Sequence, residues 1–148
     1  MLGKTAGGLF WMFRNLERSE YTGRLIEAGF RIALTRPDGD EWVSVLRTAA
    51  SEQAYLDVHV DIEQTSVIDF LLRDTDNPSS VMSSIAMARQ NARLVRTAIT
   101  REVWEAVNEA YMVLKARLAR PVPMRDLPEV LGMIRQHSSL VGGALQSS

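Results

Sequence analysis

The stretch NPSSVMSSIAMARQNARLVRTAI, residues 77–99, decides the fold class. Its apolar residues recur at alternating steps of four and three, the spacing of one face of an α-helix. Asn is a preferred N-cap residue and Pro is favoured at the first helical position, so we expect a helix that begins at Pro78 with Asn77 as its cap. Alanines in the middle of the apolar seam permit close packing against another helix. The predicted seam contains Val81, Ile85, Ala88, Ala92, Val95 and Ile99.

A second long helix is expected from about Gly8 to Leu34, where apolar residues also recur at helical spacing. Turn-forming residues at 36–40 end this pattern. The tryptophans Trp11, Trp42 and Trp104 occupy apolar helical positions and are expected in the core. The predicted buried stripe of this helix contains Phe10, Phe13, Tyr21, Leu25, Ala28 and Ile32.

Further helices are predicted by N-cap signals followed by apolar periodicity. Residues 58–62 alternate like a strand, but an isolated strand has no partner, so we expect a helix entrance there. The last helix should open with a capping box formed with Glu129 and fray at Gly142-Gly143. The predicted caps are Asp38 or Asp40, Asp61 or Thr65, Thr100, and Asp126.

These patterns predict an all-α fold, a helical bundle of about five or six helices with no significant sheet. We expect one domain spanning residues 1–148, with a proline-containing break near 119–123. The composition agrees with one soluble globular domain, because 46% of the 148 residues are hydrophobic and 24% are charged.

The charge and residue content exclude several classes of function. A formal net charge of -1 argues against a nucleic-acid partner. The apolar run at 9–13 is too short to span a bilayer, so no membrane partner is expected. The absence of cysteine excludes disulfides and thiolate zinc sites and fits a cytoplasmic location. No Glu is followed by His three residues later, as a helical di-iron site needs, so we predict no metal and no cofactor.

Three arginines, Arg89, Arg93 and Arg96, lie beside the predicted seam of residues 81–99 and should border the interior. A guanidinium near a core needs a carboxylate, a carbonyl or a bound anion, because an unpaired buried charge is costly. The opposing group is expected on the first helix, where Arg14 and Glu17 share a side with the apolar stripe. Either Glu17 bridges to Arg89 or Arg93, or the arginines bind an anion.

The segment Asn77-Pro78-Ser79-Ser80 admits two interpretations. A helix N-terminus with free backbone N–H groups and two hydroxyls is a suitable place for an anion. The same residues can serve as an ordinary cap without a ligand. No spacing of His59 or His137 implies a catalytic triad, so we assign no catalytic residue.

Several motifs resemble the bacterial alpha-E domain family in their order along the chain. They are MLGKTA (1–6) with LFW (9–11), RNLERSE (14–20), DFLLRD (69–74) with NPSSV (77–81), ARQNARLVR (88–96) and EVWEAVN (102–108). The resemblance reaches to about residue 118 and implies an all-helical protein. It singles out a polar cluster for ligand binding or burial: Arg14, Glu17, Arg18, Asn77, Ser79, Ser80, Arg89, Asn91, Arg93 and Arg96.

Genes of that family neighbour, or are fused to, genes for circularly permuted ATP-grasp ligases and transglutaminase-like proteins. The resemblance therefore implies a non-catalytic helical scaffold in a peptide or amide-ligase system. The alternative is an enzyme, or half of one, that binds a phosphate or carboxylate substrate at the polar cluster.

Family members are usually about twice this length, so the resemblance also implies a shortened member or a fragment. We therefore expect exposed apolar surface, and either a homodimer or a protein partner such as the ligase or a second alpha-E half.

Overall fold

Seven α-helices and two 3₁₀ turns make up the part of the chain that this computed structural model describes, residues 2–36 and 40–147, and none of those residues is in a strand. The all-α prediction is confirmed, with one helix more than expected because residues 52–56 form a short helix of their own. The elements are α1 (Leu2–Thr35), α2 (Asp40–Thr48), α3 (Glu52–Leu56), α4 (Gln64–Arg73), α5 (Val81–Leu94), η1 (Arg96–Ala98), α6 (Arg101–Arg117), η2 (Met124–Asp126) and α7 (Leu127–Gln146).

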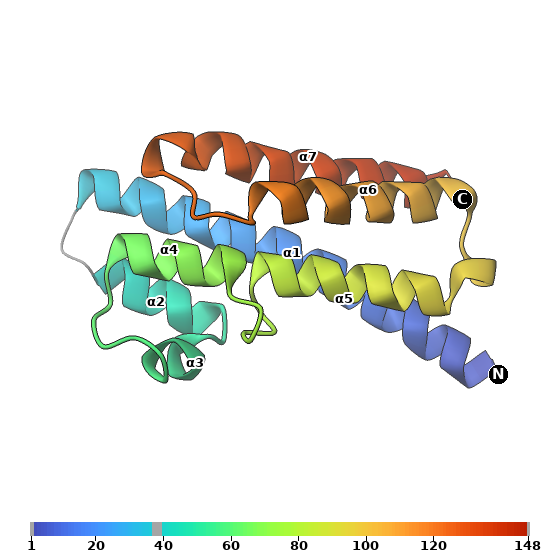
Figure 1. The fold of residues 1–148 in the computed structure, drawn as a ribbon, viewed down its shortest axis with the longest axis horizontal. Helices are drawn as coiled ribbons and strands as arrows, with labels where there is room; N and C mark the ends of the chain where they lie inside the picture. The colour runs from blue at the N-terminus through green and yellow to red at the C-terminus, as the bar shows by residue number, and fades with distance from the viewer. Residues whose placement is uncertain (1, 37–39, 148) are drawn as a thin grey trace.

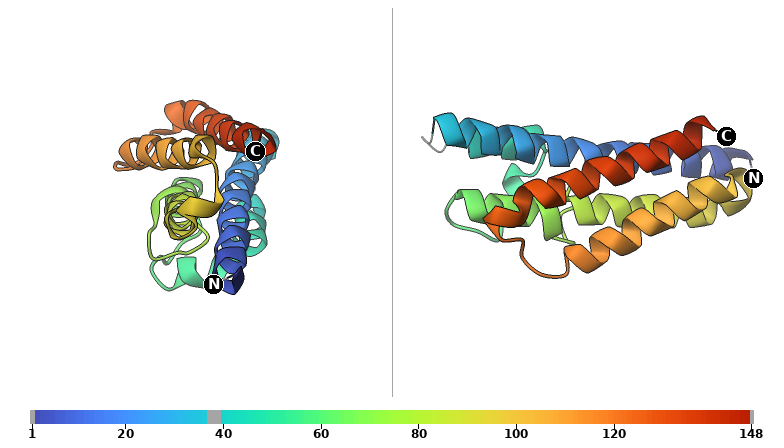
Figure 2. Two further views of the ribbon diagram at one scale, coloured as in Figure 1. Left: turned by 90° about the vertical axis from the view of Figure 1, so that its right-hand side faces the viewer. Right: turned by 90° about the horizontal axis from the view of Figure 1, so that it is seen from above.

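The longest helix, α1, runs the length of the molecule, with α5, α6 and α7 alongside it (Figure 1). The shorter helices α2, α3 and α4 gather at the end where α1 finishes, and α4 and α5 follow one another along the same direction. The two views of Figure 2 place both termini at the opposite end. Within the described ranges, no helix is long and apolar enough to cross a membrane.

The hydrophobic core has two parts. The larger is built mainly from α2, α4, α5 and α7 and includes the fully buried Tyr55, Leu71 and Leu127. The smaller lies toward the termini and contains Met12, Ala92, Val103, Val107 and Val141. As predicted, Thr100 caps α6 by accepting a hydrogen bond from the Val103 N–H at 3.2 Å.

The start of α5 differs from the prediction. The helix begins at Val81, with Ser80 as its N-cap, because the Ser80 Oγ accepts the Ser83 N–H at 3.1 Å. Asn77 instead turns its amide toward Ser51. The apolar seam is confirmed for the five positions from Val81 to Val95, which are all buried. Ile99 lies beyond the end of α5 and is partly exposed.

The predicted buried stripe of α1 is wrong at five of its six positions, and the sixth, Leu25, is partly buried against the core. Phe10, Phe13, Tyr21 and Ile32 are 40–55% exposed, and Trp11 is also half exposed. The physical reason is that small residues let the backbones of two helices approach closely, which larger side chains would prevent. At Gly29, an added Cβ would lie 2.8 Å from the Trp42 ring. The residues of α1 that are buried instead are Met12, Asn15, Ser19, Thr22, Gly23, Ile26 and Gly29.

Several predicted helix ends also need correction. The N-cap of α4 is Glu63, not Asp61 or Thr65, and its side chain makes no capping bond. The Asp126 side chain forms no capping box, because it pairs with Arg117 at 3.3 Å. Helix α7 continues through the two glycines at 142 and 143 to Gln146.

Two further predictions concern the burial of the tryptophans and the N-cap of α2. Trp42 is buried as predicted, whereas Trp104 is only half-buried. Of the alternative caps for α2, Asp38 lies outside the described residues, and Asp40 is the first residue of that helix.

Candidate functional site

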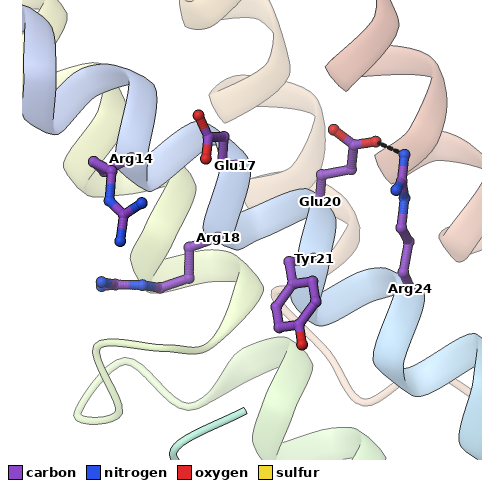
Figure 3. A pocket seen from close by; sticks show the side chains of 6 residues that line it. All are labelled: Arg14, Glu17, Arg18, Glu20, Tyr21 and Arg24. Carbon is purple, nitrogen blue, oxygen red and sulfur yellow. Dashed lines mark hydrogen bonds and ion pairs between the residues drawn. The ribbon is translucent and has the colours of Figure 1, made fainter. Parts of the chain in front are cut away.

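Six side chains of α1 line a shallow hollow of about 350 Å³ on the surface (Figure 3). They recur at three- and four-residue steps, so they share one side of the helix. We call this surface the outer face of α1. Its residues are Arg14, Glu17, Arg18, Glu20, Tyr21 and Arg24.

The charges on the outer face are mostly unpaired. Glu20 and Arg24 form an ion pair. Within the described chain, Arg14, Glu17 and Arg18 make no ion pair. In Figure 3 the Arg14 and Arg18 side chains extend toward one edge of this face, and the Glu17 carboxylate extends toward the opposite edge. Both signs of charge are therefore available to a binding chain.

An aromatic patch adjoins this charged surface toward the N-terminus of α1. Phe10 and Trp11 are 55% and 50% exposed, and their rings pack edge to face with centroids 5.2 Å apart. The Arg14 guanidinium lies 6.0 Å from the Phe10 ring centroid and links the patch to the outer face. Exposed aromatic side chains beside charged groups are typical of surfaces that bind other proteins.

Arg89 lies elsewhere, between α5 and α6. Its Nε donates to the Asn108 Oδ1 at 2.8 Å, and its guanidinium lies 4.7 Å from the Tyr111 ring centroid and 5.8 Å from that of Trp104. The Arg96 guanidinium also lies near Trp104, 5.5 Å from its ring centroid.

The predicted bridge from Glu17 to Arg89 or Arg93 is therefore wrong. The small residues of α5 face α1, so the Arg89 side chain on the flank of the seam reaches α6 instead. Arg93 is exposed and forms no ion pair among the described residues.

Asn91 is the predicted site residue of α5 that meets α1. Its Oδ1 accepts a hydrogen bond at 3.1 Å from the Nδ2 of Asn15, which also donates to the Trp11 carbonyl at 2.8 Å. Asn15 is 5% exposed, and sequence reasoning did not single it out. The available signal was an Asn inside a helix, where its side chain competes with the backbone for hydrogen bonds.

The turn at Asn77–Ser80 is closed by its own hydrogen bonds. The Asn77 N–H donates to the Asp74 carboxylate at 3.0 Å, and the Ser79 N–H donates to the Asn77 Oδ1 at 3.1 Å. The Thr22 hydroxyl donates to the Ser79 carbonyl at 3.0 Å and fastens the turn to α1. The N–H groups of Asn77 and Ser79 therefore already have partners within the chain, as the capping interpretation requires.

The ten predicted residues thus fall into three separate groups. One lies on the outer face of α1, one lies along α5 and α6, and one is structural. In residues 2–36 and 40–147 no group of three acidic or histidine side chains is placed to hold a metal ion. The groups are Arg14, Glu17 and Arg18; Arg89, Arg93 and Arg96; and Asn77, Ser79, Ser80 and Asn91.

Comparison with protein families gives a match over residues 1–148. The matching family, Alpha-E, is described as a predicted alpha-helical domain with a conserved ER motif. The chain therefore belongs to the Alpha-E family. No curated protein and no solved structure matches it. Glu17-Arg18 is the one place in the sequence where Glu directly precedes Arg, so the ER motif of this chain lies on the outer face of α1.

Proposed function

We propose that this member of the Alpha-E family is a non-catalytic helical scaffold that binds a protein partner through the outer face of α1. The partner we propose is an ATP-grasp-type peptide or amide ligase, which the gene associations of the family imply. One observation carries the proposal. The Glu17-Arg18 pair, which matches the ER motif in the family's description, lies on an exposed surface, and neither side chain has an ion-pair partner within the described chain.

Physical chemistry favours a protein as the occupant of this face. Charges exposed on the free chain contribute little to its stability, but they set orientation and specificity when a complementary surface covers them. The neighbouring exposed Phe10 and Trp11 supply the apolar area from which binding energy comes. The proposed interface therefore has an aromatic anchor beside a pattern of both charges.

The alternative, an enzyme that binds an anionic substrate at one Arg/Glu/Asn cluster, loses its geometric basis. Glu17 lies on the outer face of α1, whereas Arg89 contacts Asn108 of α6. A substrate between α1 and α5 would also have to enter a seam of small buried residues. For this reason we propose a binding role.

The test is titration calorimetry with a purified ATP-grasp-type peptide or amide ligase. We expect Glu17→Arg to weaken binding by about tenfold or more, which corresponds to about 1.4 kcal/mol. Glu109→Arg makes the same charge change at an exposed position of α6 and should leave binding unchanged.

Three results would overturn the proposal. The first is the absence of binding between the ligase and the wild-type chain, and the second is equal binding of the Glu17→Arg and Glu109→Arg variants. The third is a stable dimer in solution that Glu17→Arg dissociates, because the outer face would then be covered by a second copy of this chain. Molar mass from light scattering distinguishes that case.

A further inference from the structure

A second surface, on the groove between α5 and α6, has a different chemistry. We propose that this groove binds an acidic, amphipathic segment of a partner protein. The inference is independent of the outer face of α1, because none of the residues that line the groove belongs to α1.

The groove is a cavity of about 510 Å³ that is open to solvent and has an apolar floor. Met82 and Leu118 are buried in it, and Met87, which is 49% exposed, stands at its edge. Methionine is unbranched and polarisable, so surfaces rich in it adapt to the apolar side chains of a bound helix. The floor can therefore accept the apolar side of a peptide.

A row of cations and aromatic rings begins at Tyr111 and Lys115, which line the groove, and extends beyond the groove through Arg89. Lys115 lies 5.5 Å from the Tyr111 ring centroid, and Arg89 lies 4.7 Å from the same centroid. Arg89 and Arg96 are in turn 5.8 Å and 5.5 Å from the centroid of Trp104. We call these residues the cation row. The rings and the bond to Asn108 hold the charges in place before any ligand arrives, which lowers the entropy cost of binding.

The charge of this region is positive and uncompensated. None of the side chains lining the groove is acidic. Arg73, at the far end, is already committed, because it pairs with Asp69 and donates to the Leu118 carbonyl. Among the described residues, Lys115, Arg89 and Arg96 form no ion pair. An acidic ligand would therefore supply the carboxylates that the chain itself does not.

The spread of the charges favours a polypeptide over a ligand with a single acidic head group. Trp104 and Lys115 are eleven residues apart on α6, which is roughly 16 Å along the helix. One carboxylate cannot neutralise cations distributed over that length. A helix with acidic side chains three and four residues apart can reach each of them while its apolar side lies on the methionines.

The probe is a fluorescein-labelled peptide of about 18 residues, which is roughly 27 Å long as a helix. It carries Leu on one helical face and Glu on both flanks of that face. We expect a rise in fluorescence anisotropy when it binds the full chain, and weaker binding as salt increases. A peptide with Lys in place of Glu should not bind. The double variant Arg89→Gln, Lys115→Gln should weaken binding by about tenfold or more.

Matched variants control for charge and for folding. Arg31→Gln with Arg101→Gln removes the same charge at exposed sites outside the groove and should leave binding unchanged. Met87→Glu places a carboxylate at the edge of the groove and should abolish binding, whereas Met87→Leu should preserve it. Circular dichroism confirms that each variant is folded.

The proposal is overturned if the acidic peptide fails to bind the folded chain, if the Lys peptide binds equally, or if the two double variants behave alike. Laurate serves as a competitor with one carboxylate on an apolar chain. Displacement of the peptide by laurate at a lower concentration than by unlabelled peptide would show that the groove takes a fatty acid instead.

Discussion

The two faces of α1 differ in what their side chains do. The face toward α5 buries small and polar residues, among them Asn15, Ser19 and Thr22, each at most 5% exposed. The outer face leaves Tyr21 50% exposed, and the nearby Phe10 and Phe13 on the same helix are at least 40% exposed. The inner face fixes the position of α5 through close contact and hydrogen bonds. The outer face instead leaves charged side chains at the surface, where we propose that another protein binds.

This contrast shows that apolar periodicity alone does not identify the buried side of a helix. Close approach of two helices requires small side chains on both, and α5 supplies Ser84, Ala88 and Ala92, all fully buried. Large aromatic residues at the same place would push the helices apart. Their position on the outer face is therefore consistent with a surface that another protein covers.

The largest expected difference in stability is between alanine variants of Met12 and Phe13, which are adjacent in sequence and lie on different faces of α1. Met12 is fully buried and Phe13 is 40% exposed. Met12→Ala should lower the free energy of unfolding by about 2–5 kcal/mol, because it removes buried methylenes and leaves a cavity. Phe13→Ala should cost less than half as much. Urea denaturation of both variants measures the difference, and equal losses would contradict the assignment of the two faces.

Alanine substitutions at two glycines of α1, Gly29 and Gly7, should change the free energy of unfolding in opposite directions. A Cβ at Gly29 would lie 2.8 Å from the Trp42 ring and 2.9 Å from Val45, whereas Gly7 has nothing within 4 Å. Gly29→Ala should destabilise the fold, because overpacking of about 1–3 kcal/mol exceeds the helix-propensity gain of about 0.5–1 kcal/mol. Gly7→Ala should keep that gain. Thermal unfolding followed by circular dichroism compares them, and stabilisation by both would refute close packing at Gly29.

Removal of the hydrogen bond between Asn15 and Asn91 should lower the free energy of unfolding by a moderate amount. Asn15→Ala removes the donor to the Asn91 Oδ1 and should cost about 1 kcal/mol. A double-mutant cycle with Asn91→Ala should give a coupling energy of about 0.5–1.5 kcal/mol. Additive losses in urea denaturation would mean that the two amides do not stabilise each other.

The smallest effect on stability is expected on the outer face itself. Glu17→Gln and Arg14→Gln should each change the free energy of unfolding by less than about 0.5 kcal/mol, because both side chains are exposed and unpaired in the described chain. Denaturation and ligase binding should be measured on the same samples. A large loss of stability from either variant would assign the motif to the fold and not to binding.

Much of the fold could be predicted because its signals are local. The cap at Thr100 and the seam from Val81 to Val95 depend on spacing within a single helix. The start of α5 could not be predicted, because the Asn77 amide is engaged by Ser51, twenty-six residues away. Arg89 was correctly placed beside the core, but its partner Asn108 lies on a helix whose orientation no local pattern gives.

The sequence by itself determined the helical class, the cap of α6 at Thr100 and the location of the Glu17-Arg18 motif on a helix, because helical periodicity and capping depend on neighbouring residues. Only the tertiary structure decided which side of α1 is buried and that the arginines of α5 and α1 do not meet. Both outcomes follow from how closely α1 and α5 approach, which small side chains on two distant segments set together.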